Sequence, residues 1–247
     1  MRKVILGLSL VVLTVGLAFS QEKIMVGYMD NPPNINTEQG KATGVLVDYW
    51  ENYIAPAMQV KIEWVGPLPP SRSFQMLQDG EINCIALISK NPERAKIYDF
   101  SDKPTREVTA GIAILKKNQS TITSVNSLQG KIVTFIKDGF IPDIMKKVDI
   151  KWDLISSPTW KVQGFRKLVG ERVDAVFDPD IATLDYVQAQ KDFSAVVMTI
   201  PLRGTESLNY AMFSKKDNGK YVTLYNKARA TDTVSYADLL KKSLAKQ

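Results

Sequence analysis

One arginine in this chain, Arg94, stands where it could bind a small carboxylate. It closely follows the apolar run of residues 82–88, which has the length of a strand. Asn91 is a favourable helix N-cap and Pro92 suits the first helical position, so a short helix is predicted just beyond that strand. A guanidinium offers a planar set of donors that matches a carboxylate, and the free N–H groups of a helix start add positive charge. The alternative is a surface arginine paired with a neighbouring acidic side chain.

The sequence excludes several common kinds of catalytic site. It has no histidine and one cysteine, Cys84, which lies inside the same apolar run. A Ser-His-Asp triad, a Cys-His pair and a zinc centre built on such residues therefore cannot be assembled. We expect Cys84 to be a small buried hydrophobic residue. We also expect no metal, no cofactor and a protein that is not an enzyme.

The N-terminus has the pattern of a secretory signal peptide. Arg2 and Lys3 precede an apolar run of residues 4–19, and small residues follow before Gln21. The run is shorter than the roughly 20 apolar residues that a spanning helix needs, which disfavours the alternative of a membrane anchor. We therefore predict that residues 1–20 are removed and that the mature protein is soluble and periplasmic.

The charge pattern argues against nucleic acid as a partner. The full chain carries a formal net charge of +6, and removal of the predicted signal peptide takes away two positive charges. The remaining charges are spread without a long basic run. The mature length is enough for one large or two modest domains with cores of their own. We expect two domains and a monomeric protein.

Strands and helices are predicted to alternate along the chain in two similar units. Predicted strands cover residues 23–28, 60–65, 82–88, 131–136, 151–155 and 173–177. The first predicted helix carries one apolar face, made of Leu46, Tyr49, Trp50, Tyr53 and Ile54. Later predicted helices cover residues 142–147, 159–169 and 236–245. This α/β alternation implies parallel, doubly wound sheets, whose ligands bind beyond the carboxyl ends of the strands, where Ser89 and Arg94 fall.

Six short segments then occur in the order and spacing of one protein family. They are residues 44–48 (Gly-Val-Leu-Val-Asp), 77–84, 92–94 (Pro-Glu-Arg), 98–102 (Tyr-Asp-Phe-Ser-Asp), 127–131 and 173–176 (Val-Asp-Ala-Val). On these segments the chain resembles the family 3 extracellular solute-binding proteins, the periplasmic amino-acid-binding type. The resemblance covers nearly the whole mature chain. It implies the two-lobed type II periplasmic binding protein fold, in which each lobe is a mainly parallel sheet flanked by helices.

The resemblance also implies how the chain is divided. Residues 21–108 would form the first part of lobe 1, residues 109–202 would form lobe 2, and residues 203–247 would return to lobe 1. Two crossover strands would act as the hinge. By analogy with that family, the lobes would close on the ligand, and closure removes water from the charges that the ligand carries.

Carried over residue by residue, the family pattern implies a set of ligand contacts. Arg94 and Ser89 match the positions that hold an α-carboxylate. The family usually has a carboxylate just after the Val-Asp-Ala-Val strand, where it takes an amino group. Here that register falls at Pro179, with Asp178 and Asp180 on either side, so one of them would substitute. The alternative is that these two aspartates cap the next helix.

The chain departs from the family pattern around the expected ligand. Where the family has a glycine followed by small hydroxyl residues, this chain has Asp138, Gly139 and Phe140. Asp138 would repel an anion, whereas Phe140 would either stack on an apolar part of the ligand or pack in the core. The N-terminal ligand loop, which begins at Asn31, lacks the usual aromatic residue. These departures argue against an ordinary α-amino acid.

Two further residues have two interpretations each. Arg72 lies in a Pro-x-x-Arg pattern known from one branch of the family, and it would be either a second cation in the cleft or a solvated arginine packed on Trp64. Trp160 starts a predicted helix of lobe 2, where it would face either the cleft or the core.

The resemblance favours a receptor that captures a small carboxylate-bearing solute, an amino acid or a related compound, and delivers it to an ABC permease. One alternative is a ligand-sensing partner of a membrane signalling protein. Another is a lyase or dehydratase on the same scaffold, with Asp178, Asp180 or Glu206 as acid or base. Fold alone does not separate these functions.

Overall fold

The computed structural model describes residues 21–231 and 233–244. The predicted signal peptide, residues 1–20, lies outside the described residues. Within the described ranges, none of the helices has both the length and the apolar character that a membrane span requires.

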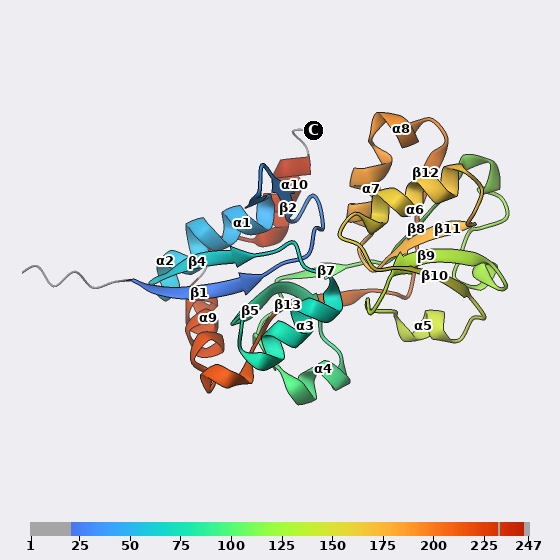
Figure 1. Ribbon diagram of the computed structural model, residues 1–247. Coiled ribbons are helices and arrows are strands. Elements are labelled where there is room, and N and C mark those ends of the chain that lie inside the picture. The colour runs from blue at the N-terminus through green and yellow to red at the C-terminus, as the bar shows by residue number, and fades with distance from the viewer. Residues whose placement is uncertain (1–20, 232, 245–247) are drawn as a thin grey trace, which may run out of the picture.

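Two separate sheets organise the chain, as Figure 1 shows. The sheet of the first lobe has the order β4-β1-β5-β13-β6, with β7 also paired to β13. Its strands are β1 (Glu22–Gly27), β4 (Val60–Val65), β5 (Cys84–Ser89), β6 (Asp99–Phe100), β7 (Arg106–Val108) and β13 (Ser207–Phe213). A small hairpin pairs β2 (Asn36–Glu38) with β3 (Lys41–Thr43). The sheet of the second lobe has the order β10-β9-β11-β8-β12. Its strands are β8 (Gly111–Leu115), β9 (Ile132–Ile136), β10 (Lys151–Ile155), β11 (Ala175–Asp178) and β12 (Val197–Pro201).

Both sheets are mixed, which corrects the expectation of mainly parallel sheets. In the first lobe β1 pairs in parallel with β4 and β5, whereas β13 runs antiparallel to β5, β6 and β7. The second lobe repeats this division, with β9 parallel to β10 and β11, and β8 antiparallel to β11 and β12. Parallel neighbours are reached through helical crossovers. The strands β8 and β13 enter their sheets directly from the other lobe and run in the opposite direction.

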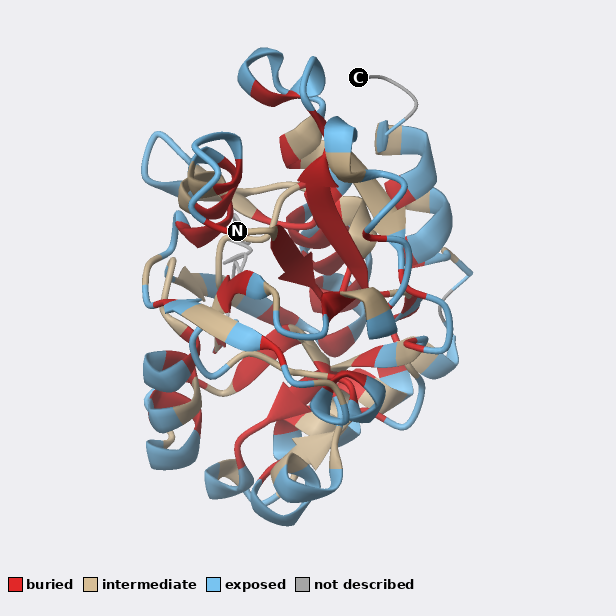
Figure 2. Cartoon of the chain, turned by 90° about the vertical axis from the view of Figure 1, so that its right-hand side faces the viewer, coloured by how far each residue is buried: buried red, intermediate tan, exposed pale blue. Residues whose placement is uncertain are grey.

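Helices cover the sheets of both lobes, so that buried residues concentrate in the strands and exposed residues on the outer helix faces (Figure 2). In the first lobe they are α1 (Val45–Tyr49), the π-helical η1 (Trp50–Ile54), α2 (Ala55–Met58), α3 (Pro70–Asp79), α4 (Pro92–Ile97), η4 (Lys215–Asp217), α9 (Lys220–Ala230) and α10 (Tyr236–Leu244). In the second lobe they are η2 (Lys116–Asn118), η3 (Asn126–Leu128), α5 (Asp143–Lys146), α6 (Trp160–Val169), α7 (Ile181–Gln188) and α8 (Lys191–Ser194).

The first helical segment differs from the sequence expectation at one residue. Tyr49, Trp50 and Ile54 are fully buried, but Tyr53 is 39% exposed. The reason is the π-helical turn at η1, which adds a residue to the turn and rotates Tyr53 away from the buried face. The 3.6-residue period used for the prediction does not hold across such a turn.

The chain crosses between the lobes twice, after β7 and after β12. The two crossings are held side by side, because Leu202 N donates to Ala110 O at 2.8 Å and Ala110 N donates to Thr205 Oγ1 at 3.1 Å. Antiparallel pairing continues on both sides of this point, β8 with β12 in one sheet and β7 with β13 in the other. The C-terminal helices α9 and α10 lie with the first lobe, beside the N-terminal strands (Figure 1).

Candidate ligand-binding site

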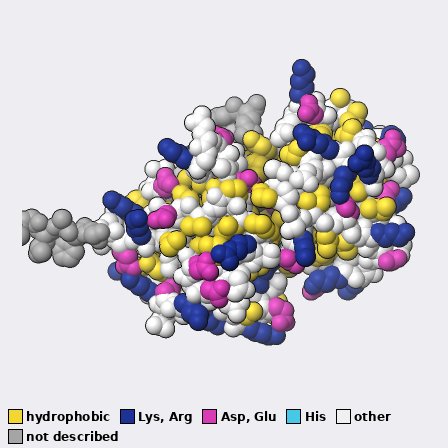
Figure 3. Space-filling view, in the orientation of Figure 1, with side chains coloured by type: hydrophobic (Ala, Val, Ile, Leu, Met, Phe, Trp, Pro, Cys, Tyr) yellow, Lys and Arg dark blue, Asp and Glu magenta, His cyan; other side chains and the backbone are white. Residues whose placement is uncertain are grey.

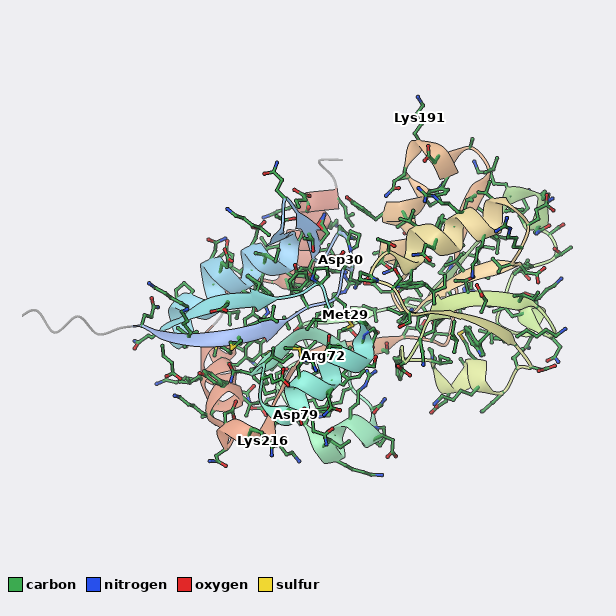
Figure 4. All side chains as sticks on the ribbon, in the orientation of Figure 1. Met29, Asp30, Arg72, Asp79, Lys191 and Lys216 are labelled. Carbon is green, nitrogen blue, oxygen red and sulfur yellow. The ribbon has the colours of Figure 1, made fainter. Side chains whose placement is uncertain are left out.

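A cavity of about 120 Å³ lies between the lobes, beyond the carboxyl ends of β1, β5, β9 and β11. A single buried water needs about 10–15 Å³, so this space admits a small organic solute. The first lobe contributes Met29, Asp30, Asn31, Phe74, Ser89, Arg94 and Asn209, among others. The second lobe contributes Phe135, Asp138, Gly139, Phe140, Trp160, Lys161, Asp178 and Asp180. Figure 4 shows Met29 and Asp30 at the junction of the two lobes.

Arg94 is held in the cavity by its own helix start and by an aromatic wall. The Asn91 side chain caps α4 by accepting from Arg94 N at 2.8 Å, as the sequence predicts. Arg94 Nη1 donates to Ser89 O at 2.9 Å, and the guanidinium carbon lies 4.7 Å from the centroid of the Phe74 ring. These contacts fix the plane of the guanidinium.

The charge of Arg94 has no carboxylate partner among the described residues. Its neighbour Glu93 pairs instead with Lys96 on the surface. Burial lowers the pKa of Arg94 to about 10, which leaves the side chain charged at neutral pH. A half-buried cation that lines a cavity is suited to bind an anion.

Ser89 and Asn209 lie beside Arg94 on paired strands. The Ser89 hydroxyl donates to Asn209 Oδ1 at 2.9 Å, and the two residues are direct partners in the β5–β13 register. The hydroxyl proton of Ser89 is therefore committed to Asn209, and its carbonyl to Arg94. Sequence analysis missed Asn209 because only the pairing of two strands that lie 120 residues apart brings it to Ser89.

Asp178, at the end of β11, is already paired by a lysine from its own lobe. Lys161 Nζ lies 2.9 Å from Asp178 Oδ2, and the side chains are only 8% and 5% exposed. The same nitrogen donates to Asn31 Oδ1 at 2.6 Å, so Lys161 also links the second lobe to the first. The Lys161 nitrogen also lies 4.9 Å from the centroid of the Trp160 ring. Trp160 is buried and also lines the cavity, so it agrees with both interpretations given for it above. Sequence analysis did not single out Lys161.

Asp180 both caps a helix and takes part in an ion pair. Its Oδ1 accepts from Ala182 N at 3.2 Å and so caps α7, which is the alternative given above for this residue. The same carboxyl pairs with Arg106 at 2.6 Å, and both side chains are buried. Burial raises the pKa of Asp180 despite the attraction of Arg106.

Asn34 extends this ion pair into a network between the two lobes. Its Oδ1 accepts from Arg106 Nη1 at 2.9 Å and from the Tyr236 hydroxyl at 2.6 Å, and its Nδ2 donates to Asp180 Oδ2 at 3.4 Å. Arg106 belongs to β7, Tyr236 to α10, and Asp180 to the second lobe. The network therefore joins β7 and the C-terminal helix to the second lobe.

The loop after β9 forms the second-lobe wall of the cavity. Asp138 is exposed and has φ 62°, whereas Phe140 is half-buried and lines the cavity. Gly139 has no room for a side chain, because a Cβ there would lie 2.4 Å from Phe135 Cζ. The loop thus places an aromatic ring in the cavity wall, whereas its one carboxylate is exposed to solvent.

Arg72 does not line the cavity, contrary to the expectation that it could be a second cation there. Its side chain is 53% exposed and pairs with Glu81 at 3.0 Å. The reason is helical geometry. The cavity-lining residues of α3 are Pro70 and Phe74, four residues apart on one face, and Arg72 between them points elsewhere. Figure 4 shows Arg72 on α3.

The described residues contain no cluster of side chains suited to hold a metal ion. On the face that Figure 3 shows, basic and acidic side chains are interspersed over both lobes. Cys84 is fully buried, as predicted.

Residues 24–242 match the sequence profile of the bacterial extracellular solute-binding proteins, family 3. The chain belongs to this family. This confirms the resemblance read from the sequence. No curated protein matches the chain.

Solved structures give the same fold for this family 3 protein. An ancestral arginine-binding protein bound to arginine is 26% identical, with a TM-score of 0.74 over 89% of this chain and 97% of that one. The arginine-, lysine-, histidine-binding protein ArtJ from Geobacillus stearothermophilus is 21% identical, with a TM-score of 0.74 over 92% and 96%. An ancestral amino-acid-binding protein, a precursor of cyclohexadienyl dehydratase, is 22% identical, with a TM-score of 0.72 over 89% and 94%. These matches confirm the type II periplasmic binding protein fold.

Proposed function

We propose that this family 3 protein captures a small carboxylate-bearing solute, an amino acid or a related compound, between its two lobes. The observation that carries the proposal is Arg94, a charged guanidinium without an acidic partner among the described residues, held at the wall of the interlobe cavity. A ligand carboxylate would complete its hydrogen bonding. Desolvation on binding strengthens such a charge pair, provided that the geometry is good.

The closed form would then deliver the solute to an ABC permease. A ligand that contacts residues of both lobes binds their closed arrangement better than the separated one, and so shifts the population towards it. The cavity has walls from both lobes, and the chain crosses between them at only two points in the described part. The relatives include a substrate-binding protein of an amino acid ABC transporter, at 19% identity. We place the mature protein in the periplasm, after removal of residues 1–20.

A receptor is favoured over a lyase or dehydratase by the state of the cavity carboxylates. An acid or base must be able to exchange a proton with the substrate. Asp178 and Asp180 are instead held in ion pairs with Lys161 and Arg106. Consumption of a carboxylate by the purified protein, followed by NMR, would reverse this ranking.

The experiment compares ligand binding by the wild type and by Arg94→Met, using a panel of amino acids, other carboxylates and polyamines. Thermal shift identifies the ligand, since about 100 times the dissociation constant adds roughly 2.7 kcal/mol to stability. Calorimetry then measures affinity. Removal of one partner of a buried charge pair costs about 2–5 kcal/mol of binding, so Arg94→Met should lose most of the affinity.

Arg72→Met is the matched control, because that arginine pairs with Glu81 outside the cavity. It should bind as the wild type does. Unchanged affinity in Arg94→Met, or binding of polyamines alone, would refute the proposal.

A further inference from the structure

The charged side chains around the cavity differ in whether the protein itself supplies a partner of opposite charge. Both buried carboxylates of the lining, Asp178 and Asp180, have a cation of the protein within 3 Å. The half-buried cation Arg94 has no carboxylate in the described part of the chain. A bound solute therefore meets a half-buried cation that lacks a carboxylate partner, whereas the two fully buried carboxylates already have cations.

The ammonium group of Lys161 already pairs with the Asp178 carboxylate. Its nitrogen has a charged partner in Asp178 and a second acceptor in Asn31 Oδ1, at 2.6 Å. A ligand ammonium could reach Asp178 only by displacing this lysine, which would leave Lys161 buried without its partner. Breaking a buried pair in this way is strongly unfavourable.

Two other carboxylates lie along the lining, Asp30 and Asp138. Asp138 is exposed to water, which weakens its attraction for a ligand charge. Asp30 is half-buried and accepts a hydrogen bond from Thr37 Oγ1 at 3.0 Å. Both residues are more exposed than Asp178 and Asp180, so neither offers a ligand ammonium the fully buried partner that those two carboxylates would provide.

The remaining walls are largely apolar. Phe74 and Ile88 line the first-lobe side, and Phe140 and Trp160 line the second-lobe side. Such walls favour an apolar body, and an ammonium that loses its water against the aliphatic part of them finds no hydrogen-bond acceptor there. Both the charge pairing and the apolar walls thus favour a solute with an apolar body and no ammonium group.

We propose that the preferred solute is a carboxylate with an apolar or aromatic body and no ammonium group, and that Lys161 is the residue that excludes the ammonium. This rests on the proposed function, since it assumes that Arg94 binds the carboxylate. It narrows the solute class from amino acids and related compounds to their deaminated relatives.

The test uses matched pairs that differ only in the ammonium. Calorimetry would compare 3-phenylpropanoate with L-phenylalanine, and 4-methylpentanoate with L-leucine, within the carboxylate panel described above. We expect the tightest binder to lack an ammonium, and each such acid to bind at least about tenfold tighter than its amino acid, since an unpaired buried charge is costly.

A Lys161→Met variant should change this preference. With Asp178 left without its cation, the amino acid should gain at least about tenfold in affinity relative to its deaminated partner. Lys167→Met is the matched control, because Lys167 lies on the same helix and pairs with Asp153 at 2.7 Å outside the cavity. It should keep the wild-type preference. If Lys161→Met does not fold, the wild-type comparison decides the question.

The outcomes separate this inference from the proposed function. Tightest binding of an α-amino acid, lost in Arg94→Met, would overturn the inference and leave the proposed function standing. An unchanged preference in folded Lys161→Met would remove Lys161 from its role. Failure of every carboxylate to bind would overturn both proposals.

Discussion

Replacing Arg106 by methionine should strongly destabilise the protein, because it leaves a buried carboxylate without its cation. Arg106 and Asp180 lie 2.6 Å apart, and their side chains are 7% and 5% exposed. Removing one partner of such a pair typically costs about 3–5 kcal/mol. The lost hydrogen bond to Asn34 belongs to the same network, so the total should stay within that range.

Urea unfolding followed by tryptophan fluorescence would measure this change in the free energy of unfolding. An exposed pair serves as the control: Lys146 and Asp143 lie 2.7 Å apart with side chains 59% and 90% exposed, so Lys146→Met should change stability by less than about 1 kcal/mol. The double variant Arg106→Met with Asp180→Asn should recover part of the loss, because the buried charge is then absent.

The pH dependence of folding stability provides a second test of the Arg106→Met prediction. Burial raises the pKa of Asp180, and loss of Arg106 should raise it further, although Lys161 still faces it. A raised folded-state pKa means that the folded protein binds a proton before the unfolded chain does, so stability rises as pH falls. The deficit of Arg106→Met should therefore shrink between neutral pH and the unfolded pKa near 4. A deficit below about 1 kcal/mol at pH 7, or one that grows on acidification, would refute the reasoning.

Two further predictions concern packing. Gly164→Ala should destabilise the second lobe by about 1–3 kcal/mol in urea unfolding, although alanine ordinarily favours a helix. The reason is that the added Cβ would lie 3.0 Å from Thr134 Cγ2 and 3.2 Å from Val176 Cγ1. Unchanged stability would show that the helix can shift to make room. Cys84 should react with a thiol reagent only after urea unfolding, since it is fully buried and burial raises the pKa of its thiol. Rapid labelling of the folded protein would contradict this.

The sequence predicted the elements whose signals are local. The strands at residues 60–65 and 151–155 have the expected bounds, and Asn91 caps the helix that carries Arg94. These follow from short-range preferences, because a cap, a proline at the first helical turn and an apolar run act on neighbouring residues. The placement of Ser89 and Arg94 at a cavity needed only the further rule that ligands bind beyond strand ends.

The tertiary structure alone decided which charges in the cavity are satisfied. The sequence offered Asp178 and Asp180 as ligand residues, but it could not show that Lys161 and Arg106 already pair with them. Those partners are separated along the chain by 17 residues for one pair and 74 for the other, and only the packing of α6 and β7 in the folded chain brings them together. Charge pairing is a property of distance in space, which the order of residues does not specify.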